Sequence, residues 1–133
     1  MRPPRSSVHA LAGLVLLCTT APLAAQSGSP GAGAATFRLT CAPCHSSIAG
    51  RNGIGPSLFG VVGRPAGSAP GYSYSPAMSS SGLVWTDAEI MEFLASPSAK
   101  VPGTKMTLTG VADADKRLDI IAFLKTLRSG GDK

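Results

Sequence analysis

The sequence predicts a small all-α domain with three main helices, short helical turns and long loops. Two segments rich in apolar residues follow helix-start signals, and a shorter segment of helical character precedes them. No segment alternates apolar and polar residues in the way that predicts a strand. The 16 glycines and 11 prolines are abundant for 133 residues, and they favour structured loops between the helices.

Residues 1–25 have the composition of a bacterial export signal. Arg2 and Arg5 form a basic start, and the apolar run over residues 10–18 is too short to span a bilayer. Small residues then lead to an expected cleavage after Ala25. An uncleaved membrane anchor is the alternative, and the short apolar run argues against it. The segment predicts export to the periplasm with no stable membrane insertion after cleavage.

The rest of the chain is expected to form one domain. A Gly/Ser/Ala/Pro-rich stretch predicts a flexible linker over residues 26–32, followed by the domain over residues 33–129 and a disordered tail over residues 130–133. Removal of Arg2 and Arg5 lowers the net charge from +5 to +3, because the 12 basic residues become 10, against 7 acidic ones. This modest charge gives no support to nucleic-acid binding.

The first half of the domain is expected to contain one short helix and long loops. Residues 34–44 predict a helix that carries Phe37. Residues 46–71 show little periodicity, and a loop of about 25 residues is unusual in a small domain unless it wraps a cofactor. Ser75 and Pro76 predict the N-cap and the first residue of a single helical turn.

Two longer helices are expected in the second half. Thr86 and Glu89 form a capping-box signature, in which hydroxyl and carboxylate bind reciprocal backbone N–H groups. The helix that they open is expected to reach about Ala95, and the last helix is expected from about Asp113 to about Arg128. The apolar side chains are Ile90, Phe93 and Leu94 in the first helix and Leu118, Ile120, Ile121, Phe123, Leu124 and Leu127 in the second.

The string Cys41-Ala42-Pro43-Cys44-His45 is the most specific chemical feature of the sequence. Two cysteines at this spacing, followed directly by a histidine, are typical of covalent haem attachment, with the thiols on the haem vinyl groups and the imidazole on the iron. A zinc site would need a fourth ligand, and these are the only Cys and His residues outside the signal. A thioredoxin-like redox pair would need a βαβ context, which the sequence lacks.

The chain resembles the class I (mitochondrial-type) cytochrome c family. Besides the cysteine string, the resemblance rests on Gly33 and Phe37, on Gly55-Pro56, on Pro102-Gly103-Thr104-Lys105-Met106, and on Ile120 and Phe123. The last two match the face of the C-terminal helix against which the N-terminal helix packs in this family. The resemblance implies the cytochrome c fold, wrapped around one covalently bound haem c.

The resemblance also implies the axial ligands of the haem iron. His45 and Met106 are expected on its two sides, and Met78 is the competing methionine. Pro56 is expected to accept a hydrogen bond from the second ring nitrogen of His45, which orients the imidazole and makes it a better donor. A thioether ligand favours ferrous iron relative to a second imidazole.

Three more residues match positions that hydrogen-bond the haem propionates in the family. These are Arg64, Tyr74 and Trp85. The chemical need is general, because a partly buried carboxylate requires donors or a counter-charge.

Three positions depart from the family pattern. Phe93 stands where a tyrosine hydroxyl commonly reaches the methionine ligand, Met78 replaces a polar residue, and Leu108 replaces an aromatic residue. A drier pocket raises the reduction potential, whereas a more electron-rich sulfur lowers it. The sequence therefore leaves the sign of the net effect open.

The resemblance implies a soluble periplasmic one-electron carrier between respiratory or dehydrogenase partners. The alternative is a dedicated electron-accepting subunit of a periplasmic dehydrogenase complex. A haem enzyme or sensor of peroxidase type would need an open sixth position, and Met106 argues against it, so we expect no catalytic residues. We expect a monomer with unidentified redox protein partners. Lys100, Lys105 and Lys116 are either steering residues for acidic partners or ordinary solvated lysines.

Overall fold

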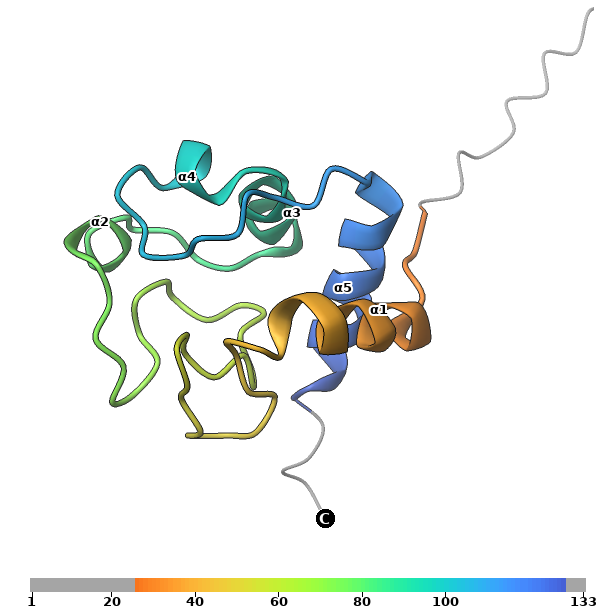
Figure 1. The fold of residues 1–133 in the computed structure, drawn as a ribbon, viewed down its shortest axis with the longest axis horizontal. Helices are drawn as coiled ribbons and strands as arrows, with labels where there is room; N and C mark the ends of the chain where they lie inside the picture. The colour runs from red at the N-terminus through yellow and green to blue at the C-terminus, as the bar shows by residue number, and fades with distance from the viewer. Residues whose placement is uncertain (1–25, 129–133) are drawn as a thin grey trace, which may run out of the picture.

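The computed structural model describes residues 26–128 (Figure 1). The helical segments in chain order are α1 (Pro30–Thr36), the π-helical turn η1 (Phe37–Cys41), α2 (Pro76–Ser79), α3 (Asp87–Ala95), α4 (Pro97–Lys100) and α5 (Ala114–Thr126). The only β pairing in this part of the chain is an isolated bridge between Pro65 and Val84. The predicted all-α fold is confirmed. The signal predicted over residues 1–25 and the tail predicted over residues 130–133 lie outside the described residues.

The prediction of a flexible linker over residues 26–32 is wrong in part, because helix α1 begins at Pro30. The Oγ atom of Ser29 accepts the N–H of Ala32 at 3.4 Å, and Pro30 takes the first helical position. The N–H of Ser29 also donates to Oδ1 of Asp119 on α5 at 2.6 Å. This Ser–Pro helix-start signal is present in the sequence, but the Gly and Ser residues around it mask it. The helical segment also ends earlier than expected, at Cys41.

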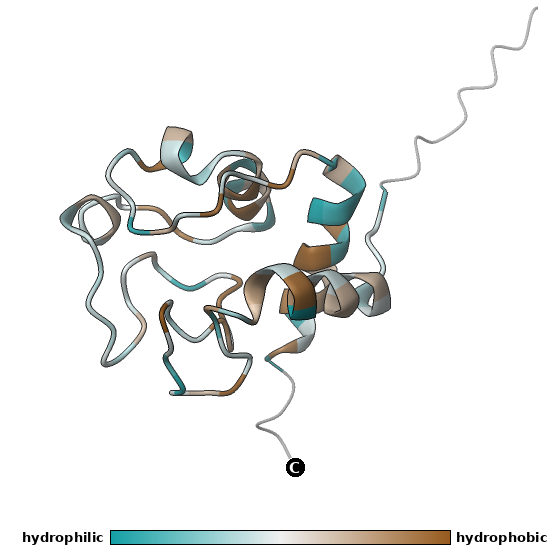
Figure 2. Ribbon diagram, viewed as in Figure 1, coloured by the Kyte–Doolittle hydropathy of each residue, from teal (hydrophilic) through white to brown (hydrophobic). Residues whose placement is uncertain are grey.

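A glycine lies where α1 crosses α5. A Cβ atom on Gly33 would lie 1.9 Å from the carbonyl oxygen of Asp119 and 2.8 Å from the Cβ of Phe123. Phe37 and Phe123 pack against each other with ring centroids 5.1 Å apart. Figure 2 shows apolar residues on α5 where α1 crosses it. The predicted packing of the N-terminal helix on the C-terminal helix is confirmed.

Helix α3 begins as predicted, but only half of the capping box forms. The Oγ1 atom of Thr86 accepts the N–H of Glu89 at 3.2 Å. The Glu89 carboxylate turns instead to the Nζ of Lys100 at the end of α4, at 2.7 Å. The three apolar residues predicted for the inner face of α3 are buried.

Helix α5 also begins at its predicted cap. The Oδ1 atom of Asp113 accepts the N–H of Asp115 at 3.0 Å and that of Lys116 at 3.3 Å. The helix ends at Thr126, slightly before the predicted end. Its residues Ile120, Ile121 and Leu124 are buried in the core.

The chain between η1 and α2 forms hydrogen-bonded loops without a helix, as predicted. The N–H of Gly55 donates to the carbonyl oxygen of Cys44 at 2.8 Å, and that of Leu58 donates to Ser46 at 2.8 Å. These bonds hold the loops against the end of η1, where they form one side of a cavity. Within residues 26–128 no helix is long and apolar enough to cross a membrane.

Candidate cofactor site

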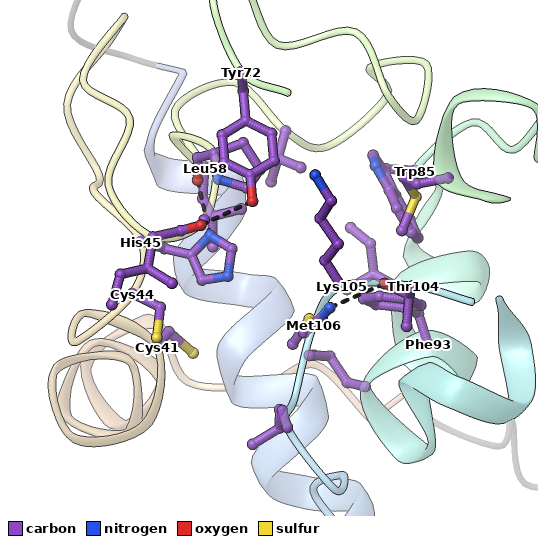
Figure 3. Close-up of a pocket in the computed structure, with 18 of the residues that line it drawn as sticks. Cys41, Cys44, His45, Leu58, Tyr72, Trp85, Phe93, Thr104, Lys105 and Met106 are labelled. Carbon is purple, nitrogen blue, oxygen red and sulfur yellow. Dashed lines mark hydrogen bonds between the residues drawn. The ribbon is translucent and has the colours of Figure 1, made fainter. Parts of the chain in front are cut away.

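A cavity of about 230 Å³ lies between these loops, α3 and α5, and its walls are mostly apolar (Figure 3). The residues predicted to hold the cofactor all line it: Cys41, Cys44, His45, Pro56, Arg64, Tyr74, Trp85 and Met106. The fold thus brings together side chains that are far apart in the sequence.

The two cysteines lie at one end of this cavity. The carbonyl oxygen of Cys41 accepts the N–H of Cys44 at 3.1 Å and that of His45 at 2.9 Å, and this turn places both sulfur atoms on the same side (Figure 3). The two cysteines form no disulfide. Burial, with a smaller contribution from Cys44, raises the pKa of Cys41 to about 11. Burial therefore disfavours a thiolate at Cys41, whereas the reactive cysteine of a thioredoxin-like site has a lowered pKa.

A structural zinc site lacks its donors in the described part of the chain. Within residues 26–128, no three His, Cys, Asp or Glu side chains are grouped so that they could hold a metal ion. Structural zinc sites almost always have four such ligands.

His45 points into the cavity with its orientation fixed. Its Nδ1 atom lies 2.8 Å from the carbonyl oxygen of Pro56. Because a carbonyl can only accept, Nδ1 carries the proton and Nε2 keeps a free electron pair. Burial lowers the pKa of His45, and the hydrogen bond to Pro56 opposes this shift. The neutral imidazole thus presents Nε2 as a ligand atom.

Met106 faces His45 across the cavity (Figure 3). It lies in the loop after α4, where its N–H donates to Oγ1 of Thr104 at 3.3 Å. The Nζ of the neighbouring Lys105 donates to the carbonyl oxygen of Ser73 at 2.9 Å. This bond ties the Met106 loop to the loop that precedes α2.

In the described part of the chain, one N–H group of Arg64 has no hydrogen-bond acceptor. Its two terminal nitrogens donate to the carbonyl oxygens of Phe59 and Ser57, each at 3.0 Å. Its Nε is buried and has no hydrogen-bond partner among the described residues. A buried N–H without a partner is costly, and a carboxylate in the cavity would satisfy it.

Tyr74 and Trp85 extend the wall beside Arg64. The Tyr74 hydroxyl accepts the N–H of Ala69 at 3.1 Å and keeps its own proton for donation. The Trp85 ring is buried and packs against Phe93 with centroids 4.9 Å apart. Two thiols at one end, a free imidazole nitrogen facing a thioether, apolar walls and an unpaired guanidinium N–H fit a haem c with its propionates.

Comparisons with known proteins find cytochromes c among the relatives of this chain. The chain is 49% identical over 104 residues to cytochrome c2 of Rhodopila globiformis, which covers 78% of this chain and 98% of the relative. It is 45% identical over 108 residues to cytochrome c2 of Rhodoblastus acidophilus, which covers 80% of this chain and 100% of the relative. The chain belongs to the class I cytochrome c family.

A solved structure extends this finding from sequence to fold. Cytochrome cH from Methylobacterium extorquens matches with a TM-score of 0.70 and 48% identity, over 74% of this chain and 99% of that chain. No protein-family model matches the chain. This cytochrome c carries one covalent haem c at Cys41 and Cys44 and is an electron carrier, so the predicted family, cofactor and electron-transfer function are confirmed.

The three departures from the family pattern all line the cavity. Phe93 and Met78 are buried, and Leu108 is half-buried. None of these side chains has a hydrogen-bonding hydroxyl or amide. This part of the wall is therefore as apolar as the sequence predicts.

Tyr72 is a site residue that the sequence analysis did not single out. Its hydroxyl donates to the carbonyl oxygen of Ile54 at 2.8 Å, and its ring packs edge-on against Tyr74 with centroids 4.8 Å apart. Both tyrosines line the cavity. The signal was the repeat of the aromatic residue two positions apart in Gly71-Tyr72-Ser73-Tyr74.

Proposed function

We propose that this cytochrome c is a periplasmic one-electron carrier whose haem iron is held between His45 and Met106, with no substrate chemistry of its own. The observation that carries the proposal is the facing arrangement of these two side chains across one cavity (Figure 3). Both are neutral donors. Together they would fill both axial positions and leave none open for a substrate.

His45 serves as the fixed ligand in this proposal. The bond from Nδ1 to the Pro56 carbonyl sets the tautomer, limits ring rotation and makes Nε2 a stronger donor. Gly55 leaves the space that the ring needs, because a Cβ atom there would lie 2.3 Å from Cε1 of the imidazole.

Met106 serves as the second ligand, held by two contacts of its loop. One is the bond of its own N–H to Thr104, and the other is the bond from Lys105 to Ser73. When bound, the haem supplies a reversible one-electron couple, which a thioether ligand shifts toward the ferrous form relative to a second imidazole. The Pro-Gly-Thr-Lys-Met string around Met106 favours it over Met78.

The remaining walls exclude water and receive the propionates. Apolar side chains cover most of the cavity, and Nε of Arg64 and the hydroxyl of Tyr74 are available as donors. Within residues 26–128, no Asp or Glu side chain lines the cavity. A pair of carboxylates that could act as general acid and base is therefore absent from the described lining of this cavity.

The periplasmic location is supported by the export-signal composition of residues 1–25 and by the bacterial cytochrome c2 relatives. We further propose that the protein is a monomer that meets its redox partners in turn, in preference to a fixed subunit of a dehydrogenase complex. Size-exclusion chromatography of a native periplasmic extract tests this, with elution of this haem protein near its monomer mass expected. Elution only within a larger complex would contradict it.

Carbon monoxide binding tests whether the haem iron has a coordination position free for an external ligand. Addition to the ferrous holoprotein should leave the absorption spectrum unchanged, because Met106 occupies the sixth position. The Met106→Ala holoprotein is the positive control and should bind carbon monoxide. Rapid binding by the unaltered protein would contradict the proposed function.

A further inference from the structure

We propose that Arg117 is a positioning residue for Met106, and that its contacts with the chain after Met106 keep this ligand on the ferric haem iron. The proposal deepens the proposed function and rests on it, because the proposed function makes Met106 the second axial ligand. The segment concerned is called the strap and is defined as residues 107–112, between Met106 and the cap of α5 at Asp113.

On the C-terminal side of Met106, the strap has its first anchors only at its far end. Among the described residues, no hydrogen bond joins residues 107–110 to another part of the chain. The N–H of Val111 then donates to the carbonyl oxygen of Leu94 near the end of α3, at 2.7 Å. The position of Met106 on this side therefore depends on the contacts that hold Val111 and Ala112.

Arg117 holds both of these residues from α5. Its Nη1 atom donates to the carbonyl oxygen of Val111 at 2.5 Å and to that of Ala112 at 2.8 Å. Hydrogen bonds from a charged donor are stronger than those between neutral groups. One side chain of α5 thus ties the end of the strap to the helix that follows it.

The same guanidinium also contacts α3. The Nε atom of Arg117 lies 3.3 Å from Sδ of Met91, a weak acceptor, and both side chains are half-buried. Gly110 lies against the end of α3, since a Cβ atom there would lie 2.2 Å from the carbonyl oxygen of Ala95. Arg117 therefore fixes the strap relative to both helices that border the cavity.

Movement of Met106 away from the iron requires movement of the strap. A thioether ligand favours ferrous iron, so the ferric protein is the state in which Met106 is held less firmly by the metal. In that state the hydrogen bonds of Arg117 oppose release of Met106, in addition to the bond between iron and sulfur. Loss of these hydrogen bonds should make the sixth coordination position open more often.

Binding of free imidazole to the ferric holoprotein measures this opening. Free imidazole replaces the thioether, so the methionine-to-iron charge-transfer band disappears as it binds. Arg117→Leu keeps an aliphatic side chain and removes the donors. This variant should bind imidazole at least about tenfold more tightly than the unaltered protein, as expected for the loss of one charged hydrogen bond. Equal affinities in the two proteins would overturn the proposal.

Two further variants separate the hydrogen bonds of Arg117 from its positive charge. Arg117→Lys keeps the charge, but one ammonium cannot replace the donors at Nη1 and Nε together, so imidazole affinity should still rise at least about threefold. Lys116→Leu removes the same charge from the adjacent, exposed residue, and its affinity should stay within about twofold of the unaltered protein. Full restoration by Arg117→Lys would reveal an effect of charge alone and contradict the proposal. An equal increase in Lys116→Leu would do the same.

A stability control separates anchoring of the strap from general loosening of the fold. Phe37→Leu weakens the ring contact with Phe123 at the crossing of α1 and α5, and Phe37 does not line the cavity. This variant should lower the urea midpoint of the holoprotein but change imidazole affinity by less than about twofold. If it tightens imidazole binding as much as Arg117→Leu, Arg117 only stabilises the fold and the proposal is wrong.

Hydrogen exchange reports on the strap without added ligand. In the ferric holoprotein, the amide of Val111 should exchange at least about tenfold faster in Arg117→Leu and within about twofold of the unaltered rate in Lys116→Leu. Unchanged exchange of this amide in Arg117→Leu would show that Arg117 does not anchor the strap. Absence of the charge-transfer band from the unaltered protein is a different outcome, because it would overturn the proposed function itself and this proposal with it.

Discussion

The carbonyl oxygen of Pro56 lies 2.8 Å from Nδ1 of His45 and holds the imidazole with Nε2 free to coordinate. Gly55 makes this contact possible, since its hydrogen atom occupies the place where any Cβ would meet the ring at 2.3 Å. The residue that orients the ligand and the residue that leaves it space are therefore adjacent in the chain. Of the two residues, only Gly55 must lack a side chain for the imidazole to fit.

Gly55→Ala should displace the imidazole and break its bond to Pro56. Because backbone and ring cannot both stay in place, the free energy of unfolding of the holoprotein should fall by about 2 kcal/mol or more. The His45 Nδ1–H signal in NMR spectra should exchange rapidly or disappear. Gly31→Ala is the control, because a Cβ at Gly31 meets only the Ser29 hydroxyl at 3.9 Å. An unchanged Nδ1–H signal in Gly55→Ala would contradict this account of the ligand.

Gly33→Ala should separate α1 from α5. The new Cβ would lie 1.9 Å from the carbonyl oxygen of Asp119, so the helices must move apart and the contact between Phe37 and Phe123 weakens. We expect a loss of about 2–4 kcal/mol in urea unfolding of the holoprotein. Gly31→Ala, two positions earlier in the same helix, should be neutral or stabilise by up to about 1 kcal/mol. Similar effects of the two substitutions would show that Gly33 is not the contact point.

Arg64→Met should loosen the loop that covers one side of the cavity. The carbonyl oxygens of Ser57 and Phe59 would both lose a charged donor, at a cost of about 2–4 kcal/mol in unfolding free energy. The reduction potential should also fall, since a lost positive charge near the iron favours the ferric form. Exposed Arg38→Met is the control and should stay within about 0.5 kcal/mol. A stability loss as small as that of the control would show that the hydrogen bonds of Arg64 do not hold this loop in place.

Phe93→Tyr should raise the reduction potential by a few tens of millivolts, on the order of a weak hydrogen bond to the methionine sulfur. Phe93 is buried and shares the cavity with Met106, so the added hydroxyl lies inside the wall and not in water. A donor to the sulfur withdraws electron density and disfavours ferric iron, which gives the expected direction of the shift. Protein-film voltammetry measures the shift. An unchanged potential would exclude a tuning role for Phe93.

Helix starts were predictable wherever the signal was local. Ser75, Thr86 and Asp113 each accept backbone N–H groups two or three residues ahead, and such contacts depend only on neighbouring residues. Ser29 makes the same contact, but this helix start was not predicted because the residues around Ser29 are rich in glycine. The predicted hydrogen bond of the Glu89 carboxylate to the helix start does not form, because this carboxylate pairs with Lys100 instead. Lys100 lies eleven positions away, so this contact depends on the tertiary fold.

Site residues were predictable where they belong to a recognisable sequence motif. Cys41, Cys44, His45 and Met106 each stand in such a motif, and the structure places them on one cavity. The engagement of Lys105 by Ser73 was not predictable, because it depends on the path of a loop that has no periodicity. For the same reason the sequence could not show which lysines remain free for a partner.

The most direct test of the central claim is the methionine-to-iron charge-transfer band of the ferric holoprotein. The account predicts this band in the unaltered protein and in Met78→Leu, a volume-conserving change of the competing methionine. It predicts loss of the band in Met106→Ala. Absence of the band from the unaltered protein would contradict coordination of the haem iron by both His45 and Met106. Loss of the band in Met78→Leu together with its retention in Met106→Ala would also contradict it.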